Sequence, residues 1–380
     1  MELAPYLRLM VQRNGSDLYF STGAKPHIKI SGQTIAIGET ALAPGEVNEM
    51  AYSVMSDDQI REFEGTLECN LAISFNQLGR FRVNVFRQRG DTSMVIRFIK
   101  SAIPSIEELN LPQMLKKLIL EKRGLILVVG STGSGKSTTL ASMIDYRNDN
   151  LTGHILSIED PIEFLHEHKK SVVNQREIGL DSMSYENALK NALREAPDVI
   201  LIGEIRDAAT MQHAIAYAET GHLCLSTLHA NNANQALDRI INFFPDSAHR
   251  QLYSDLSLNL KAVVSQRLIP TVDGQRRAAV ELLINTSYTA ELIQKGKIHD
   301  LKEAMEQGQQ RGMITFDQAL YELFKEGAIS LEEALNHADS RNNLALRIRL
   351  DSGIPAAKEP KKPKPKLADL EFEPGSSKAS

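Results

Sequence analysis

A glycine-rich segment that ends in lysine and serine constrains this chain more than any other feature. Residues 130–137 read GSTGSGKS and match G-x-x-x-x-G-K-[S/T] in full. The segment follows the apolar run LILVV (125–129) and opens a helical pattern, which is the strand–loop–helix context that the motif requires. Glycines let backbone N–H groups surround a phosphate, and the helix N-terminus adds the positive end of its dipole. The sequence therefore predicts a nucleoside triphosphate site.

The predicted cofactors are a nucleoside triphosphate and Mg²⁺. We expect the Lys136 ammonium to reach the β- and γ-phosphates and the Ser137 hydroxyl to bind Mg²⁺. A glycine-rich turn that merely ends a strand is the alternative, and the strand before and helix after the segment argue against it. The predicted phosphate-binding residues are Gly130, Ser131, Thr132, Gly133, Ser134, Gly135, Lys136, Ser137 and Thr138.

Four short apolar runs predict the fold around this loop. They are separated by helical patterns, and they read LILVV (125–129), HILSI (154–158), DVILI (198–202) and HLCLST (222–227). Strands that are apolar on both faces, with helices between them, are typical of a parallel sheet covered by helices on both sides. The predicted fold class is therefore α/β.

The rest of the chain divides into regions that differ in residue pattern and composition. Residues 1–100 predict a small α+β domain, with strands near 16–20 and 27–30, two short helices within 44–64, and a hairpin that turns at Arg89–Asp91. The other predicted regions are a linker with a lead-in helix (101–122), the ATPase core (123–284), a helical region (285–350) and a Lys-Pro-rich disordered tail (351–380).

Composition excludes several classes of protein. The 380 residues carry 43 Lys+Arg and 48 Asp+Glu, a net charge of −5, which argues against a nucleic-acid partner. No apolar run reaches the ~18–20 residues that span a bilayer, so no membrane insertion is expected. The first residues do not resemble a secretory signal, and Cys69 and Cys224 cannot form a four-cysteine zinc site. We expect a cytoplasmic protein.

Carboxylates follow two of the predicted strands. Glu204 comes directly after Val199–Gly203, where it could bind Mg²⁺ through water, activate the attacking water, or simply pair with Arg206. Glu159, Asp160 and Glu163 close another strand. Such a cluster suits a Mg²⁺-nucleotide, although a solvated loop is the simpler alternative.

Two histidines, His222 and His229, flank the last of the four apolar runs. Alone, either would be structural. The position of His229 after two acidic strands makes it a candidate sensor of the γ-phosphate.

Together these segments resemble a known family. GSTGSGKST, SIEDPIEF, PDVILIGEIRD and TGHLCLSTLHANN resemble, in order and spacing, the Walker A, Asp box, Walker B and His box of the secretion-ATPase superfamily, in the branch of type IV pilus retraction ATPases. GSDLYFSTG and GRFRVNVFRQRG resemble the N-terminal PAS-like domain of that family. The resemblance implies a RecA-like P-loop core, a smaller PAS-like domain and a helical C-terminal region.

The resemblance also implies roles for individual residues. Glu163 would polarise the attacking water, Glu204 would be the Walker B glutamate and a metal residue with Ser137, and His229 would face the γ-phosphate. Arg82 and Arg97, on the two arms of the hairpin, match the spacing of the family's arginine fingers and would act on nucleotide held elsewhere in the ring. The weaker candidates are Arg80, Arg87 and Arg89.

The implied function is a hexameric motor that uses ATP and Mg²⁺ as cofactors and powers pilus retraction and twitching motility, located peripherally at the inner-membrane base of the pilus. Its implied partners are five further copies of itself, a PilT-like retraction ATPase and the inner-membrane pilus platform protein. Residues 289–296 (TAELIQKG) replace the AIRNLIRE-like motif of the PilT branch, and its arginines and asparagine are gone. This departure resembles the accessory PilU branch.

Two alternative functions remain open at this point, a PilT-type ATPase that acts alone and a nucleotide-dependent interaction module with little turnover. Two others are disfavoured by composition. Assembly and type II secretion ATPases carry a tetracysteine zinc module that two cysteines cannot supply. A DNA-translocating ATPase would require a basic channel, for which the net charge gives no support.

Overall fold

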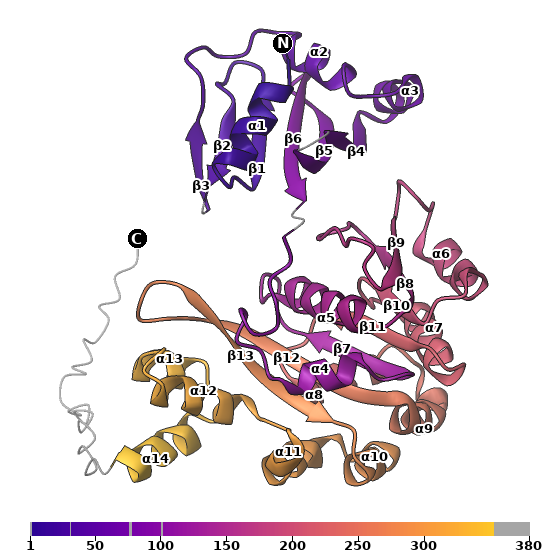
Figure 1. The fold of residues 1–380 in the computed structure, drawn as a ribbon, viewed down its shortest axis with the longest axis vertical. Helices are drawn as coiled ribbons and strands as arrows, with labels where there is room; N and C mark the ends of the chain where they lie inside the picture. The colour runs from indigo at the N-terminus through magenta and orange to yellow at the C-terminus, as the bar shows by residue number, and fades with distance from the viewer. Residues whose placement is uncertain (1, 31, 76–77, 100–101, 353–380) are drawn as a thin grey trace, which may run out of the picture.

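The computed structural model describes residues 2–30, 32–75, 78–99 and 102–352 (Figure 1). Within them, the N-terminal region contains one antiparallel sheet of six strands in the order β3-β2-β1-β6-β5-β4. The strands are β1 (Asp17–Ser21), β2 (His27–Ile30), β3 (Gln33–Ala36), β4 (Glu68–Phe75), β5 (Gly79–Gln88) and β6 (Asp91–Ile99). The expected hairpin is β5–β6, and its register pairs Arg82 with Arg97 directly.

Among the residues that the structure describes, helices cover one face of this sheet and leave the other face uncovered. They are α1 (Ala4–Gln12), α2 (Glu46–Tyr52) and α3 (Asp57–Thr66), and the last two lie where two short helices were expected. The inward residues of the strands, such as Phe20, Phe81 and Val83, form the core with them. Because side chains alternate along a strand, Arg82 and Arg97 point to the opposite, uncovered face.

The second region contains a seven-stranded sheet in the order β13-β12-β7-β11-β10-β8-β9. Its strands are β7 (Gly124–Val129), β8 (Gly153–Glu159), β9 (Ser171–Glu177), β10 (Val199–Ile202), β11 (Leu223–Leu228), β12 (Leu260–Pro270) and β13 (Arg276–Ile284). All four predicted apolar runs are strands. The four predicted strands pair in parallel with their neighbours, as expected, while β13, which was not predicted, pairs antiparallel with β12 at the edge of the sheet.

Two cores lie on opposite faces of this sheet, as expected. One face packs against α4 (Met114–Ile119) and α5 (Lys136–Asn150). The other packs against α6 (Tyr185–Ala192), α7 (Ala208–Glu219), α8 (Ala233–Ile241), α9 (His249–Asn259), α10 (Ser287–Gln294) and α11 (Leu301–Gln307). The first two helices of the predicted C-terminal region therefore belong to the core of the ATPase sheet.

The last three helices form a separate cluster. These are α12 (Phe316–Lys325), α13 (Leu331–Asn336) and α14 (Arg341–Ser352), which pack on Ile269 and Ala279 of the β12–β13 hairpin. Helix α14 continues two residues into the predicted tail, and the remainder of that tail, 353–380, lies outside the described residues. No described helix is long and apolar enough to cross a bilayer.

Candidate ATP-hydrolysis site

The predicted phosphate loop connects β7 to α5. Gly135 has φ +93°, a left-handed conformation that glycine adopts without a Cβ penalty. A Cβ on Gly130 would lie 2.4 Å from Ser134 Oγ and 2.5 Å from the Gln266 carbonyl oxygen. The loop can therefore take this tight course only with glycine at these two positions.

Lys136 is buried in the loop, and its Nζ donates to the carbonyl oxygens of Gly130 and Ser131, both at 2.9 Å. Burial lowers the pKa of Lys136, and the carboxylates of Glu204 and Glu163 oppose that shift. The buried Ser134 Oγ has no hydrogen-bond partner among the described residues. A cradle that excludes side chains, with a lysine and an unsatisfied hydroxyl, fits a phosphate group.

Glu204 follows β10, and its carboxylate contacts two side chains, those of Arg206 and His229. Arg206 Nε donates a hydrogen bond to Glu204 Oε2 at 2.9 Å, and Arg206 Nη2 lies 2.8 Å from the same oxygen. His229 Nε2 lies 3.0 Å from Glu204 Oε1. The simpler expectation, that Glu204 pairs with Arg206, is thus observed together with a contact to the His box. This contact arises because β10 and β11 are parallel neighbours, which brings their carboxyl ends together.

The loop and the His box also face a common space. A cavity of about 380 Å³ is lined by Gly130 and Ser131 on one side and by His229, Ala230 and Asn231 on the other. The structure therefore brings Lys136, Glu204 and His229 to one edge of the sheet, at the carboxyl ends of β7, β10 and β11. His222, by contrast, stands at the opposite end of β11, where Nδ1 contacts Thr220 and the Tyr217 carbonyl oxygen. It plays no part in this site.

The Asp box closes the site from β8. A small cavity of about 30 Å³ is lined by Ser137, Glu159 and Glu163 together with Phe164 and His166. Hydroxyl and carboxylate oxygens are the ligands that Mg²⁺ prefers, so Ser137, together with Glu204 at the end of β10, fits the metal that the phosphate loop implies.

Glu159 and Glu163 have different environments although both come from the Asp box. Burial raises the pKa of Glu159 to about 7, against hydrogen bonds from Ser157 Oγ (2.8 Å) and Gln175 Nε2 (3.4 Å). Glu163 is exposed and points toward the same cavity as Ser137. The three carboxylates at 159–163 are therefore not one solvated cluster, because Glu159 is held inside and Glu163 faces the nucleotide loop.

The predicted arginine fingers lie side by side on the uncovered face of the N-terminal sheet. Arg97 Nε donates to Asp17 Oδ1 at 2.7 Å, and that hydrogen bond raises the pKa of Arg97. Asp17 is almost fully buried, while the Arg97 side chain is 63% exposed. The contact holds the Nε atom of Arg97 and leaves the rest of the guanidinium available to a ligand.

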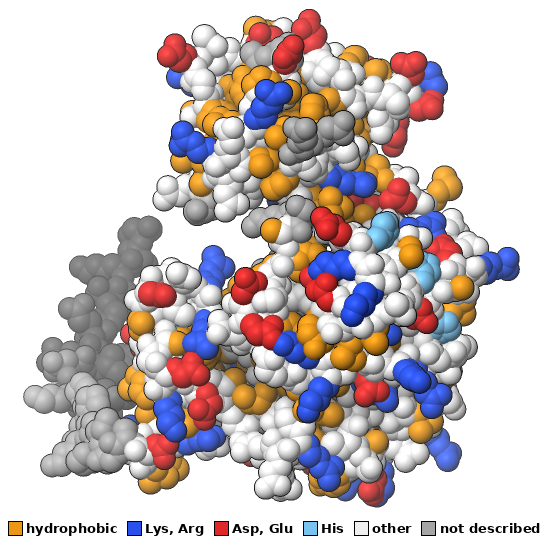
Figure 2. Space-filling model, in the orientation of Figure 1, with side chains coloured by type: hydrophobic (Ala, Val, Ile, Leu, Met, Phe, Trp, Pro, Cys, Tyr) orange, Lys and Arg blue, Asp and Glu red, His pale blue; other side chains and the backbone are white. Residues whose placement is uncertain are grey.

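This basic face lies over the Asp box of the same chain. Glu163 contributes to the raised pKa of Arg97. Burial raises the pKa of Glu177 at the end of β9, and Arg82 and Arg80 oppose that shift. Charged side chains of both signs meet at the narrow junction between the two regions (Figure 2). Of the weaker candidates, Arg87 is bound to Glu64 of α3 and to Thr92 of β6, on the face of the sheet that the helices cover.

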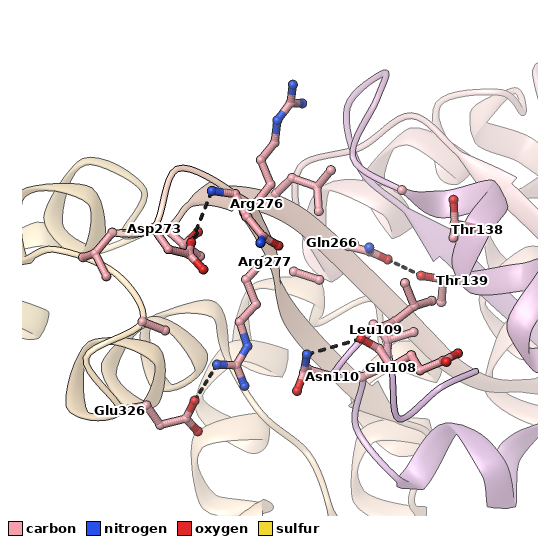
Figure 3. A pocket seen from close by; sticks show the side chains of 18 of the residues that line it. Glu108, Leu109, Asn110, Thr138, Thr139, Gln266, Asp273, Arg276, Arg277 and Glu326 are labelled. Carbon is pink, nitrogen blue, oxygen red and sulfur yellow. Dashed lines mark hydrogen bonds and ion pairs between the residues drawn. The ribbon is translucent and has the colours of Figure 1, made fainter. Parts of the chain in front are cut away.

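A larger cavity of about 610 Å³ adjoins the start of α5 (Figure 3). Thr138 and Thr139 form one wall, Glu108–Leu111 of the linker a second, and the β12–β13 hairpin with the end of α12 a third. Gln266 connects the hairpin wall of this cavity to α5, the helix that follows the phosphate loop, because its Oε1 accepts a hydrogen bond from Thr139 Oγ1 at 2.7 Å. Sequence reasoning missed Gln266, because its strand was not predicted and the residues around it carry no local phosphate-binding signal.

Glu281 on β13 is a second buried carboxyl near the His box. Its Oε1 accepts hydrogen bonds from the Ala233 N–H at 2.8 Å and from Ser265 Oγ at 3.0 Å, and burial raises its pKa to about 7. A glutamate carboxyl ionises near pH 4.5 in the unfolded chain, so the unfolded state loses its proton first. The protein should therefore lose stability from this group as the pH rises from about 4.5 to 7.

Glu281→Gln is expected to remove that pH dependence, because the amide oxygen retains both hydrogen bonds without the charge. The variant should be more stable than the wild type by about 2–3 kcal/mol at pH 8, and the difference should vanish near pH 4. Thermal melts at both pH values test this. The exposed substitution Glu332→Gln is the control, and an unchanged difference between pH 4 and pH 8 would contradict the expectation.

Comparisons with known proteins agree with this geometry. The family model described as "Type II/IV secretion system protein" matches residues 52–348. The type IV pilus ATPase PilU of Pseudomonas aeruginosa is 56% identical over 93% of this chain and 92% of its own length. The type IV pilus retraction ATPase PilT of the same organism is 41% identical over 90% of this chain and its entire length.

Solved structures give the same result. The crystal structure of the pilus retraction motor PilT with bound ADP superposes with a TM-score of 0.86, at 40% identity over 91% of this chain and 99% of that one. This match confirms the α/β fold with its RecA-like core and smaller N-terminal domain. The chain therefore belongs to the type II/IV secretion system family, among the type IV pilus ATPases that include PilU and PilT, and it is an ATP hydrolase.

Proposed function

We propose that this chain is a hexameric motor that uses ATP and Mg²⁺ to retract a type IV pilus, as an accessory to a PilT-like ATPase. The single observation that carries the motor assignment is the assembly of Lys136, Glu204 and His229 at one sheet edge, with Arg97 and Arg82 of a separate domain near Glu163 and Glu177 beside it. An ATPase site completed by a second domain links hydrolysis to movement between the two domains. We assign these domains to residues 1–100 and 123–284.

Each residue has a chemical task in this proposal. The loop N–H groups and Lys136 offset charge on the β- and γ-phosphates, and Glu163 orients the attacking water and accepts its proton. His229, oriented by Glu204, contacts the γ-phosphate, and the arginines offset the charge that develops there. Ser137 and Glu204 would hold Mg²⁺, which neutralises phosphate charge when bound.

The nucleoside would occupy the 610 Å³ cavity beside α5. Thr138 is the last of the predicted phosphate-binding residues and Thr139 follows it, so a ribose and base extending from the α-phosphate would enter between the linker and the β12–β13 hairpin. The volume lies in the range of small-molecule sites. Contact with the linker would also let bound nucleotide influence the position of the N-terminal domain.

The accessory role rests on α10 and on the identities to the two relatives. Thr289, Leu292 and Ile293 are buried, so the helix packs as its apolar spacing predicts. Glu291 and Gln294, which stand where the PilT-branch motif differs, are exposed. The departure therefore changes a surface rather than the packing. A changed surface on a preserved fold, with 56% identity to PilU against 41% to PilT, favours the PilU-type function.

Partners and location follow from the same proposal. The chain would assemble with copies of itself, stack on a PilT-like hexamer and contact the inner-membrane pilus platform protein from the cytoplasm.

Twitching motility tests the accessory role. Expressed in cells that lack every other retraction ATPase, this protein should leave the cells piliated but non-motile. Expressed with a PilT-like ATPase, it should increase the retraction force. Motility restored by this protein alone would show that it retracts without a partner, and a loss of pili on its deletion would indicate assembly instead.

A further inference from the structure

Arg267 on β12 joins three separate parts of the fold. One terminal nitrogen of its guanidinium donates to the His337 carbonyl oxygen at 2.7 Å. The other donates to the Asn231 carbonyl oxygen at 3.1 Å and to Asp339 Oδ1 at 2.7 Å. The guanidinium carbon lies 3.8 Å from the centre of the Phe316 ring. Both terminal nitrogens and the flat face of the guanidinium are therefore in contact with other residues.

One of these contacts holds the loop that carries His229. Asn231 is two residues beyond His229 and two residues before Ala233, where α8 begins. The loop is therefore fixed to the β12–β13 hairpin at two points, through Arg267 at Asn231 and through Glu281 at Ala233. His229 itself reaches Glu204, so a shift of this loop would change the contact at the reacting end of the site.

The other contacts belong to the C-terminal helices. His337 and Asp339 lie between α13 and α14, and Asp317 of α12 accepts the backbone N–H of Asp339 at 2.8 Å. Lys302 of α11 lies 3.8 Å from Asp339 and 3.7 Å from Asp317. Asp339, whose carboxylate binds Arg267, is therefore held in place by Asp317 of α12 and Lys302 of α11.

Polar contacts hold the loop on the side that faces the C-terminal helices. A cavity of about 310 Å³ separates the start of α8 from the C-terminal helices, and its lining includes Asn232, Gln235, Glu281, Lys302 and Asp339. Among the described residues that line it, only Met305 is apolar. On this side the His229 loop is held by hydrogen bonds from Arg267 and to Glu281, whereas Ala230 and Ala233 pack against the apolar core.

We propose that Arg267 is a positioning residue for ATP hydrolysis, which holds the His229 loop in its reactive place and makes that place depend on the C-terminal helices through Asp339. The inference rests on the proposed role of His229. A planar guanidinium meets three acceptors and a ring face together, which a lysine ammonium cannot do. A misplacement of about 1 Å at a reacting group can cost roughly 10²-fold in rate.

Arg267→Lys tests the proposal because it keeps the charge and loses the geometry. We expect kcat for ATP to fall by about 10-fold, while the dissociation constant for a fluorescent ATP analogue changes less than about twofold. Asp339→Asn should lower kcat in the same direction, and the two substitutions combined should not be additive. The matched control is Arg347→Lys. Arg347 also lies over an aromatic ring, that of Tyr321 in the C-terminal cluster, with its guanidinium carbon 4.3 Å from the ring centre. This substitution should leave kcat unchanged.

The decisive measurement is Arg267→Lys in a His229→Gln background, followed by single-turnover phosphate release. If Arg267 acts through His229, the second substitution adds no further loss of rate. An equal loss in both backgrounds would overturn the positioning role while leaving the role of His229 intact. A His229→Gln variant with wild-type turnover would instead refute the role of His229 and the inference that rests on it. Should Arg267→Lys fail to fold, Asp339→Asn in the two backgrounds distinguishes the same outcomes.

Discussion

Replacing Lys136 with alanine is expected to abolish ATP hydrolysis. Loss of a single group that stabilises developing charge typically lowers kcat by about 10²–10³-fold, and Lys136 also lies in the fields of Glu204 and Glu163. Without its ammonium, these carboxylates would face the phosphates uncompensated. Phosphate release from purified protein, with and without Mg²⁺, measures the effect.

Folding should survive the substitution, although Lys136 is buried. Its Nζ donates only to carbonyl oxygens of its own loop, whose residues 131–133 are exposed to water that can replace the lysine. A shift of about 2–4 °C in melting temperature, which corresponds to roughly 1 kcal/mol, is the expected size. Lys122→Ala, an exposed lysine just before β7, is the control. A folded Lys136→Ala protein with wild-type turnover would refute the assignment of this site.

Arg82→Ala is expected to lower hydrolysis by about 10³–10⁵-fold while ATP still binds, as for other arginine fingers. Arg97→Ala should act in the same direction, but it leaves the buried carboxylate of Asp17 unpaired and will also reduce stability. Arg82 is therefore the cleaner test. Phosphate release and binding of a fluorescent ATP analogue separate the two effects, with Arg61→Ala, an exposed arginine of α3, as the control. Unchanged hydrolysis in Arg82→Ala would make these arginines ordinary surface charges.

Mixing variants decides which site the arginines serve. The fold places them over Glu163 and Glu177 of their own chain, whereas the family resemblance predicts action elsewhere in the ring. An equimolar mixture of Arg82→Ala and Lys136→Ala chains should recover activity if the arginine acts on a neighbour, because an intact loop then meets an intact finger. If each arginine serves its own chain, the mixture stays inactive.

Much of the site could be predicted because its signals are local. The phosphate loop needs glycines and a lysine at fixed spacing between a strand and a helix, and all of these are adjacent in the chain. The four apolar runs were recognisable as buried strands for the same reason. β13 lies at the edge of the sheet and β12 lies next to it. Both strands were missed because polar residues such as Ser265, Gln266 and Glu281 interrupt the apolar pattern.

The sequence by itself determined the nucleotide site, the α/β class and the identity of the acidic and histidine residues that follow the strands. Only the tertiary structure decided which of them meet. Glu204 touches His229 because β10 and β11 are neighbours, and Arg267 reaches Asn231, 36 residues away, and Asp339, 72 residues away. Local patterns record the conformation of a short segment. Contacts between distant segments depend on strand order and helix packing, which no single segment specifies.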